Sequence, residues 1–264
     1  MRAVVASAFL ALALAGCATP VDTSRYAAIV AAPDRSAGDR TNDLRRKPVD
    51  MLAFMGPRPG MVVADLSAGR GYTSELLARS VGPDGKVYSQ TAPRRAAATP
   101  PAQPEGASAP PPATPPSQMP TIAERVRNPV LANVIVPVSR PFEDPIPPEA
   151  QGRADLVTLI FNYHDLGHLG VDRGQMNAAV FRALKPGGSF VVADHAGRPG
   201  TGISESGTLH RVEEQFVVRE VEAAGFRLAA RGDFLRNPAD PRDENTPEPP
   251  MPKDDFVLRF VKPR

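Results

Sequence analysis

The chain has a single cysteine and no tryptophan, and aromatic residues make up only 6% of its 264 residues. One cysteine excludes an intramolecular disulfide framework and a four-cysteine zinc site. The shortage of aromatic side chains argues against surfaces on which bases or long glycans stack. The 31 basic and 29 acidic side chains nearly cancel to a formal charge of +2, so charge gives no drive toward nucleic acid. The length suits one large globular domain.

The one cysteine follows a short apolar stretch at the start of the chain. Met1-Arg2 is a minimal basic region, and the apolar run Ala3–Ala13 is shorter than a membrane-spanning helix requires. Leu14–Cys17 (LAGC) then resembles the bacterial lipobox, where signal peptidase cuts before a cysteine that carries lipid. The alternative is an ordinary secretory signal that happens to contain a cysteine. We predict a lipoprotein signal peptide with lipidation at Cys17.

These features define the expected domain organisation. The signal peptide covers residues 1–16, a tether covers 17–42, and a single domain covers 43–264. Several acyl chains on Cys17 would hold the protein firmly on a membrane, unlike a single myristoyl group. Ala18 after the cysteine favours the outer membrane under the sorting rule of enterobacteria-like cells. We therefore expect a lipid-anchored protein on the periplasmic face of the outer membrane in a bacterial cell envelope.

The 31 prolines are unevenly distributed and mark loops. Residues 92–120 are rich in proline and alanine and contain almost no apolar side chain able to offset the entropy of ordering. We predict that they form a disordered insertion in the domain, partly in the polyproline conformation. A further proline-rich loop is expected at Asn237–Pro252.

The most informative stretch contains a glycine turn, SAGRG, at Ser67–Gly71. The apolar run Met61–Ala64 before it has the length and β-branched content of a strand, and Tyr72–Val81 after it has leucines at helical spacing. Such a turn brings bare backbone and a helix N-terminus close to a ligand. Nucleotide-like cofactors are held in this way at the carboxyl edge of a parallel sheet.

Strands and helices alternate along the rest of the chain. Further strands are predicted at Lys86–Ser89, Asn133–Val138, Ala154–Phe161, Ser189–Ala193, Phe226–Arg231 and Asp255–Val261. Helices are predicted at Thr121–Arg127, Gly174–Leu184 and Leu209–Gly225. The fourth strand in this series is strongly apolar, as parallel strands buried on both faces are. The pattern predicts an α/β fold with an open, doubly wound and mostly parallel sheet.

The spacing of the glycine turn is not the G-x-G-x-x-G of dinucleotide-binding folds. It resembles motif I of the class I S-adenosylmethionine-dependent methyltransferases, D-x-G-x-G-x-G, with Ser67 in place of the first glycine and matches at Asp65, Gly69 and Gly71. Lys47–Gly60 is similar to the segment that precedes motif I. Arg182–Gly197 is similar to the "LKPGG" segment of the same superfamily.

More narrowly, three segments resemble a bacterial group described only as predicted methyltransferases: Asn162–Leu166, Leu209–Glu214 and Glu222–Pro241. The resemblance covers roughly Arg45 to Lys262. It implies the Rossmann-like methyltransferase fold, with seven strands in the order 3-2-1-4-5-7-6. It also implies S-adenosyl-L-methionine as the cofactor and a small-molecule acceptor that the resemblance does not identify.

The resemblance assigns cofactor roles to the first strand and the glycine turn. In the family, the acidic residue at the position of Asp65 orders the motif I loop and the cofactor's amino group; the alternative is a solvated turn residue. Gly69 and Gly71 are expected to let the backbone approach the methionine moiety. Ser67 can still form the turn but crowds it.

The adenosine half of the pocket is implied by residues after the second and third strands. The family places Glu or Asp at the end of the second strand, where the carboxylate accepts both ribose hydroxyls. Here Gln90 stands at that position, and a neutral amide gives up the charge-assisted hydrogen bond. Phe142 and Glu143 are expected to contact adenine.

Catalytic candidates follow the fourth and fifth strands, which face the cofactor's methyl group in this fold. His164, with a pKa near neutral, is a candidate general base, Asp165 would orient it, and Tyr163 would shape the substrate wall. The alternative is that His164 only hydrogen-bonds its own loop. Asn162 and His195 are expected to contact the substrate.

A metal site is a further alternative, because His164 and His168 are four residues apart. Gly167 and Gly170 argue against a regular helix there, and the sequence has no H-E-x-x-H arrangement. We therefore expect no metal site. His210 is expected to be a surface or packing residue.

Two functions remain. The first is an S-adenosylmethionine-dependent methyltransferase acting on an unidentified small molecule. The second is a non-catalytic or repurposed ligand-binding lipoprotein on the same scaffold, which the predicted location outside the cytoplasm and the departures at Ser67 and Gln90 support. No nucleic-acid partner is expected, and the sequence does not indicate an oligomeric state.

Overall fold

The computed structural model describes residues 23–93, 119–245 and 251–264. The predicted signal peptide, Cys17 and nearly all of the predicted insertion at 92–120 lie outside the described residues. Lipidation and the state of the insertion therefore stay predictions.

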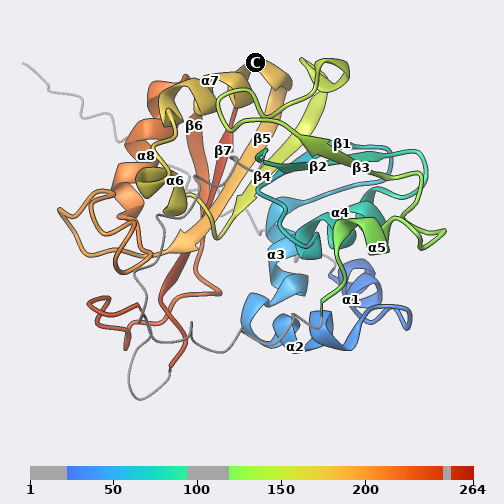
Figure 1. Cartoon of the computed structure of the whole chain (residues 1–264), viewed down its shortest axis with the longest axis horizontal. Coiled ribbons are helices and arrows are strands. Elements are labelled where there is room, and N and C mark those ends of the chain that lie inside the picture. The colour runs from blue at the N-terminus through green and yellow to red at the C-terminus, as the bar shows by residue number, and fades with distance from the viewer. Residues whose placement is uncertain (1–22, 94–118, 246–250) are drawn as a thin grey trace, which may run out of the picture.

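The domain is built on a seven-stranded sheet with the strand order β3-β2-β1-β4-β5-β7-β6 (Figure 1). Among the described strands, β7 alone runs in the direction opposite to the other six. This confirms the predicted fold class and the strand order that the resemblance implied. The strands are β1 (Val62–Leu66), β2 (Lys86–Thr91), β3 (Ile135–Ser139), β4 (Ala154–Ile160), β5 (Leu184–His195), β6 (Arg227–Gly232) and β7 (Asp255–Val261).

Helices cover both faces of the sheet. They are α1 (Ser24–Val30), α2 (Ala37–Arg46), α3 (Pro48–Met55), α4 (Tyr72–Val81), α5 (Ile122–Arg125), the 3-10 turn η1 (Pro148–Ala150), α6 (Asp165–His168), α7 (Arg173–Ala183) and α8 (Glu214–Ala223). No helix in the described part of the chain is both long and apolar enough to cross a membrane.

Side chains that alternate along the strands form two hydrophobic cores. In β4, Leu156 packs with α1, α3 and α4, whereas Val157 packs with α7 and α8. Figure 1 shows these two groups of helices on opposite sides of the sheet. Because both faces are covered, the central strands are apolar on both sides, as the sequence predicted for β4.

The predicted tether is wrong for residues 23–42, because they belong to the folded domain. The Tyr26 ring of α1 is 6% exposed and lies in the core beside α3. In α2, the buried carboxylate of Asp39 forms an ion pair with Arg125 of α5 at 2.7 Å. Ser36 caps α2 by accepting a hydrogen bond from the Asp39 backbone N–H at 3.0 Å.

Two predicted boundaries also differ. Strand β5 begins at Leu184 rather than at Ser189, the predicted start, and so contains the "KPGG" sequence; its pairing with β4 is irregular between Ala154 and Leu156. Helix α8 begins at Glu214 rather than Leu209, and His210 lies before it with a φ of 51°. This left-handed backbone is uncommon for a side chain other than glycine, and it lies beside the site described next.

Candidate functional site

A cavity of about 180 Å³ lies at the carboxyl ends of β1 and β4. Its walls are the glycine turn after β1, Phe161 and Asn162 after β4, and Arg46 and Tyr72 from the covering helices. Adjacent parallel strands end at the same edge of the sheet, so two segments far apart in sequence meet here.

The glycine turn has the left-handed backbone that its sequence predicts, with φ values of 52° at Ser67, 54° at Gly69 and 81° at Gly71. A Cβ at Gly69 would meet no atom closer than 3.9 Å, so the backbone there is open to a ligand. A Cβ at Gly71 would lie 2.9 Å from Ile122 and 3.1 Å from Arg125. The expected approach of a ligand is therefore supported at Gly69, whereas Gly71 is required by the packing of α5.

Asp65 is buried rather than solvated, with only 1% of its surface exposed. One carboxylate oxygen accepts a hydrogen bond from Ser74 Oγ at 2.6 Å, and the other accepts one from Thr158 Oγ1 at 2.8 Å. Burial raises the pKa of Asp65 to about 6 against the opposing effect of these hydrogen bonds. Asp65 thus ties β1 to α4 and β4 and fixes the start of the glycine turn.

Gln90 does not present its amide to a ribose, contrary to prediction. Its side chain is fully buried: Oε1 accepts from Ser67 N at 2.9 Å, and Nε2 donates to the Arg140 carbonyl at 2.6 Å. Both ends of the amide are used to join the glycine turn to the end of β3. The residue at this family position is structural in this chain.

The structure also does not place Phe142 and Glu143 at the cavity. Phe142 is 6% exposed and packs in the core on the α7 and α8 side of the sheet. Glu143 accepts a hydrogen bond from the backbone N–H of Asp172, just before α7, at 3.3 Å. Sequence position after β3 was not enough to predict their direction.

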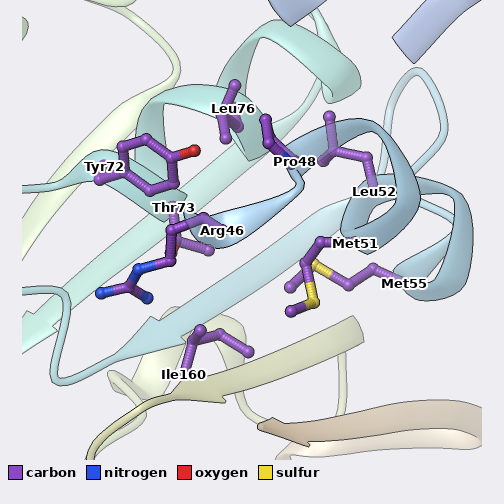
Figure 2. Close-up of a pocket in the computed structure, with 9 residues that line it drawn as sticks. All are labelled: Arg46, Pro48, Met51, Leu52, Met55, Tyr72, Thr73, Leu76 and Ile160. Carbon is purple, nitrogen blue, oxygen red and sulfur yellow. The ribbon is translucent and has the colours of Figure 1, made fainter. Parts of the chain in front are cut away.

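Arg46 is a cavity residue that sequence reasoning missed. Its guanidinium lies 4.2 Å from the centre of the Phe161 ring, and its Nε is buried without a hydrogen-bond partner among the described residues. Burial, reinforced by the charge of Arg45, lowers the pKa of Arg46 to about 10. In Figure 2 the guanidinium points away from Met51 and Met55, which line a small apolar pocket next to it. A half-buried guanidinium on the cavity wall suits an anionic ligand group.

All four histidines of the chain gather beside this cavity, at the carboxyl ends of β4 and β5. We call His164, His168, His195 and His210 the histidine cluster. The ring of His164 lies 5.5 Å from those of His195 and His210, and His168 lies 5.7 Å from His210. His210, expected to be a surface or packing residue, therefore belongs to the candidate site.

His164 is not a base of near-neutral pKa. Its Nδ1 lies 2.6 Å from Asp194 Oδ1, and its Nε2 lies 3.1 Å from Asp165 Oδ1. Burial alone would lower the pKa of this ring, but the hydrogen bonds and charges of the two aspartates raise it to about 9. In the structure as described, His164 is a buried ring whose two nitrogens both face carboxylates, so it is not the free general base that the sequence predicted.

Tyr163 lies away from the site, in the core. Its side chain is fully buried, its hydroxyl donates to Glu220 at 2.8 Å, and it accepts from Asn177 Nδ2 at 3.1 Å. Burial, followed by the charge of Glu220, raises the pKa of the phenol. Tyr163 thus connects α7 and α8 and does not form a substrate wall.

Asn162 links the glycine turn to the histidine cluster. Its Oδ1 accepts from Ser67 Oγ at 2.5 Å, and its Nδ2 donates to Asp165 Oδ2 at 2.6 Å. His195 pairs with Asp255 at 2.6 Å and lines a second, larger hollow of about 750 Å³. The two predicted substrate residues therefore lie at neighbouring openings of the same sheet edge.

No protein-family model matches the chain. In sequence, a segment of 39 residues is 51% identical to protein-L-isoaspartate O-methyltransferase of Aeropyrum pernix. This match spans 15% of the chain and only 15% of the length of that relative.

Solved structures resemble the whole domain. A SAM-dependent methyltransferase from Aquifex aeolicus aligns with a TM-score of 0.53 and 17% identity over 91% of this chain and 98% of its own. Geranyl diphosphate methyltransferase in complex with SAM aligns with a TM-score of 0.55 and 12% sequence identity, over 89% of this chain and 94% of its own. The [4+2]-cyclase SpnF aligns with a TM-score of 0.56 and 14% sequence identity, over 91% of this chain and 92% of its own. The chain therefore has the Rossmann-like fold of the class I S-adenosylmethionine-dependent methyltransferases.

Proposed function

We propose that the protein is an S-adenosylmethionine-dependent methyltransferase that acts on a small molecule held at the histidine cluster. The observation that carries the proposal is the cavity between the glycine turn and β4, with Arg46 on its wall. It lies at the sheet edge where α/β folds of this kind bind their ligands.

The residues present suit the methionine end of the cofactor. Gly69 leaves backbone open to a ligand, and Arg46 offers a guanidinium cation for a carboxylate. The ribose end has no acceptor at Gln90, so other groups must hold its hydroxyls. Because small-molecule sites usually measure several hundred Å³, the cavity of about 180 Å³ has to widen when the cofactor enters.

When bound, the cofactor supplies a methyl group on a sulfonium sulfur. The chain's residues would hold the acceptor atom in line with the carbon–sulfur bond of that methyl group. They would also take the acceptor's proton as the acceptor atom bonds to the methyl carbon and the carbon–sulfur bond breaks. His164 is buried and doubly hydrogen-bonded, whereas the side chains of His168 and His210 are 37% and 40% exposed. We therefore assign proton acceptance to the His168 ring and positioning roles to His164 and His210.

The first experiment is calorimetric titration of the purified protein with S-adenosylmethionine and S-adenosylhomocysteine. We expect both to bind, and Arg46→Met to weaken binding at least about tenfold because a charge-assisted hydrogen bond is lost. Arg58→Met is the matched control, since Arg58 is exposed and does not line the cavity, and its affinity should stay at the wild-type value. Absence of binding at millimolar ligand would reject the proposal in favour of the alternative, a non-catalytic ligand-binding protein on a methyltransferase scaffold.

A further inference from the structure

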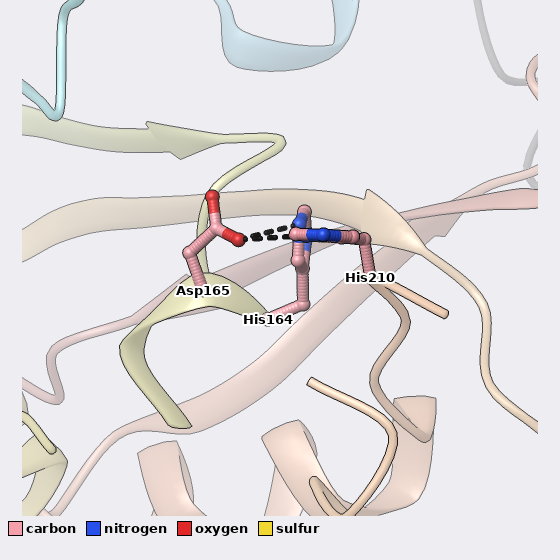
Figure 3. A group of neighbouring side chains, drawn as sticks. All are labelled: His164, Asp165 and His210. Carbon is pink, nitrogen blue, oxygen red and sulfur yellow. Dashed lines mark hydrogen bonds and ion pairs between the residues drawn. The ribbon is translucent and has the colours of Figure 1, made fainter. Parts of the chain in front are cut away.

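The histidine cluster contains a set of side chains with the chemistry and spacing of metal ligands. Asp165 Oδ1 lies 3.1 Å from His164 Nε2 and 3.1 Å from His210 Nδ1. One ligand atom from each of the three residues lies within 4.8 Å of the other two. Figure 3 shows the carboxylate of Asp165 directed at both rings. We propose that His164, Asp165 and His210 bind a divalent transition-metal ion.

The residues behind these ligands hold them in a coordinating orientation. Asp194 approaches His164 Nδ1 at 2.6 Å and accepts from the His164 backbone N–H at 2.7 Å, so Nε2 is the nitrogen that faces Asp165. Metal-bound histidines are oriented in this way by a carboxylate on the other ring nitrogen. Asn162 donates to Asp165 Oδ2 at 2.6 Å and leaves Oδ1 to face the rings.

The cluster is open on one side. His164 is buried, but His210 and the neighbouring His168 are partly exposed, and His168 Nδ1 lies 3.9 Å from Asp165 Oδ1. Ser206 Oγ holds His168 in place: it accepts a hydrogen bond from the His168 backbone N–H at 2.8 Å and lies 3.0 Å from His168 Nδ1. Three protein ligands with an accessible further position are typical of catalytic rather than structural metal sites.

The ligand set indicates the class of metal. Two imidazoles and one carboxylate suit Zn²⁺, Co²⁺ or Fe²⁺, whereas Mg²⁺ and Ca²⁺ prefer oxygen ligands. Tetrahedral ligands about 2.1 Å from a metal are about 3.4 Å from one another. The two separations of 3.1 Å that involve Asp165 are close to this value. Only the two rings have to move closer together.

The proposed metal site differs from the expectation drawn from sequence, which was that the chain has no metal site. That expectation considered His164 with His168, four residues away on one short segment. The structure instead pairs His164 with His210, which the loop between β5 and α8 brings to the same edge. The ion would lie next to Asn162 and therefore beside the cavity of the glycine turn.

Binding of Co²⁺ to chelator-treated protein tests the proposal directly. Visible absorption should report one tightly bound Co²⁺ per chain, displaced by Zn²⁺, with nitrogen ligands seen in the spectrum. His210→Ala should weaken Co²⁺ binding by about a hundredfold or more, and Asp194→Asn by about ten- to a hundredfold. His195→Ala is the matched control, because that ring pairs with Asp255 rather than facing Asp165. It should retain wild-type affinity.

His210 is partly exposed, so its alanine variant should fold, and an unchanged circular dichroism spectrum would verify this. Equal Co²⁺ affinity in wild type and His210→Ala, or no Co²⁺ absorption with wild type at millimolar metal, would overturn the proposal. The titration needs no S-adenosylmethionine. Its outcome is therefore independent of whether the cofactor binds.

Discussion

The two halves of the sheet's carboxyl edge differ in what their polar groups do. In the half formed by β1, β2 and β3, the side chains of Asp65 and Gln90 are buried and use all their polar atoms on other protein groups. In the half formed by β4 and β5, His168 and His210 are partly exposed. Polar residues at family positions can thus be structural supports, and the reactive groups lie where atoms stay accessible.

Arg125 extends the support of the first half. It donates to the carbonyl of Arg70 in the glycine turn at 2.7 Å and forms ion pairs with Asp39 of α2 and Glu75 of α4. One buried guanidinium thereby connects α2, α4, α5 and the turn. We therefore expect this half of the edge to be a rigid support.

The largest effect is expected for Arg125→Met. Asp39, 1% exposed, would lose its cationic partner, and removing one member of a buried ion pair costs about 3–5 kcal/mol. Urea unfolding should show this loss in the free energy of unfolding. Arg127→Met, which removes an exposed arginine two residues away, should change it by less than about 0.5 kcal/mol. A similar small change in both variants would mean that the first half is not held by this network.

A smaller, pH-dependent effect is expected for Asp65→Asn. The pKa of Asp65 is about 6 in the folded protein against 3.8 for an ordinary aspartate, so the folded protein takes up this proton at higher pH than the unfolded chain. The stability that Asp65 contributes is therefore present at acidic pH and lost as the pH rises through about 6. The difference in free energy of unfolding between the asparagine variant and wild type should therefore shift by about 2–3 kcal/mol in favour of the variant when the pH is raised from 4 to 7.5.

Chemical denaturation at both pH values measures this difference. Asp50→Asn, which removes an exposed carboxylate on α3, is the matched control. If Asp65→Asn differs from wild type by the same amount at pH 4 and pH 7.5, Asp65 does not titrate in this interval.

The smallest effect is expected for Gln90→Glu. A carboxylate there would face the Arg140 carbonyl that Gln90 Nε2 now donates to, at a cost of at least about 1 kcal/mol in folding free energy. Affinity for S-adenosylmethionine should not increase, because the side chain does not face the cavity. Gln175→Glu, at an exposed position of α7, should leave stability nearly unchanged. Tighter cofactor binding by Gln90→Glu would show that this residue turns toward the ribose after all.

The alternation of strands and helices could be predicted because local composition and periodicity produce it. The glycine turn, the apolar β4 and the helix Tyr72–Val81 were all found from neighbouring residues alone. Helix α2, by contrast, is mostly polar and resembled a linker. Its place in the fold depends on Asp39 meeting Arg125, which follows it by 86 residues, and no local pattern indicates that contact.

The sequence alone therefore determined the class of fold, the strand order through its resemblance, and the sheet edge at which the site lies. Only the tertiary structure decided that Gln90 is a buried support, that Arg46 lines the cavity, and that His210 joins His164 and Asp165. The reason is that secondary structure follows from local preferences of the backbone and side chains. The role of a polar side chain depends instead on which distant groups occupy its hydrogen-bonding atoms, and chain folding settles that.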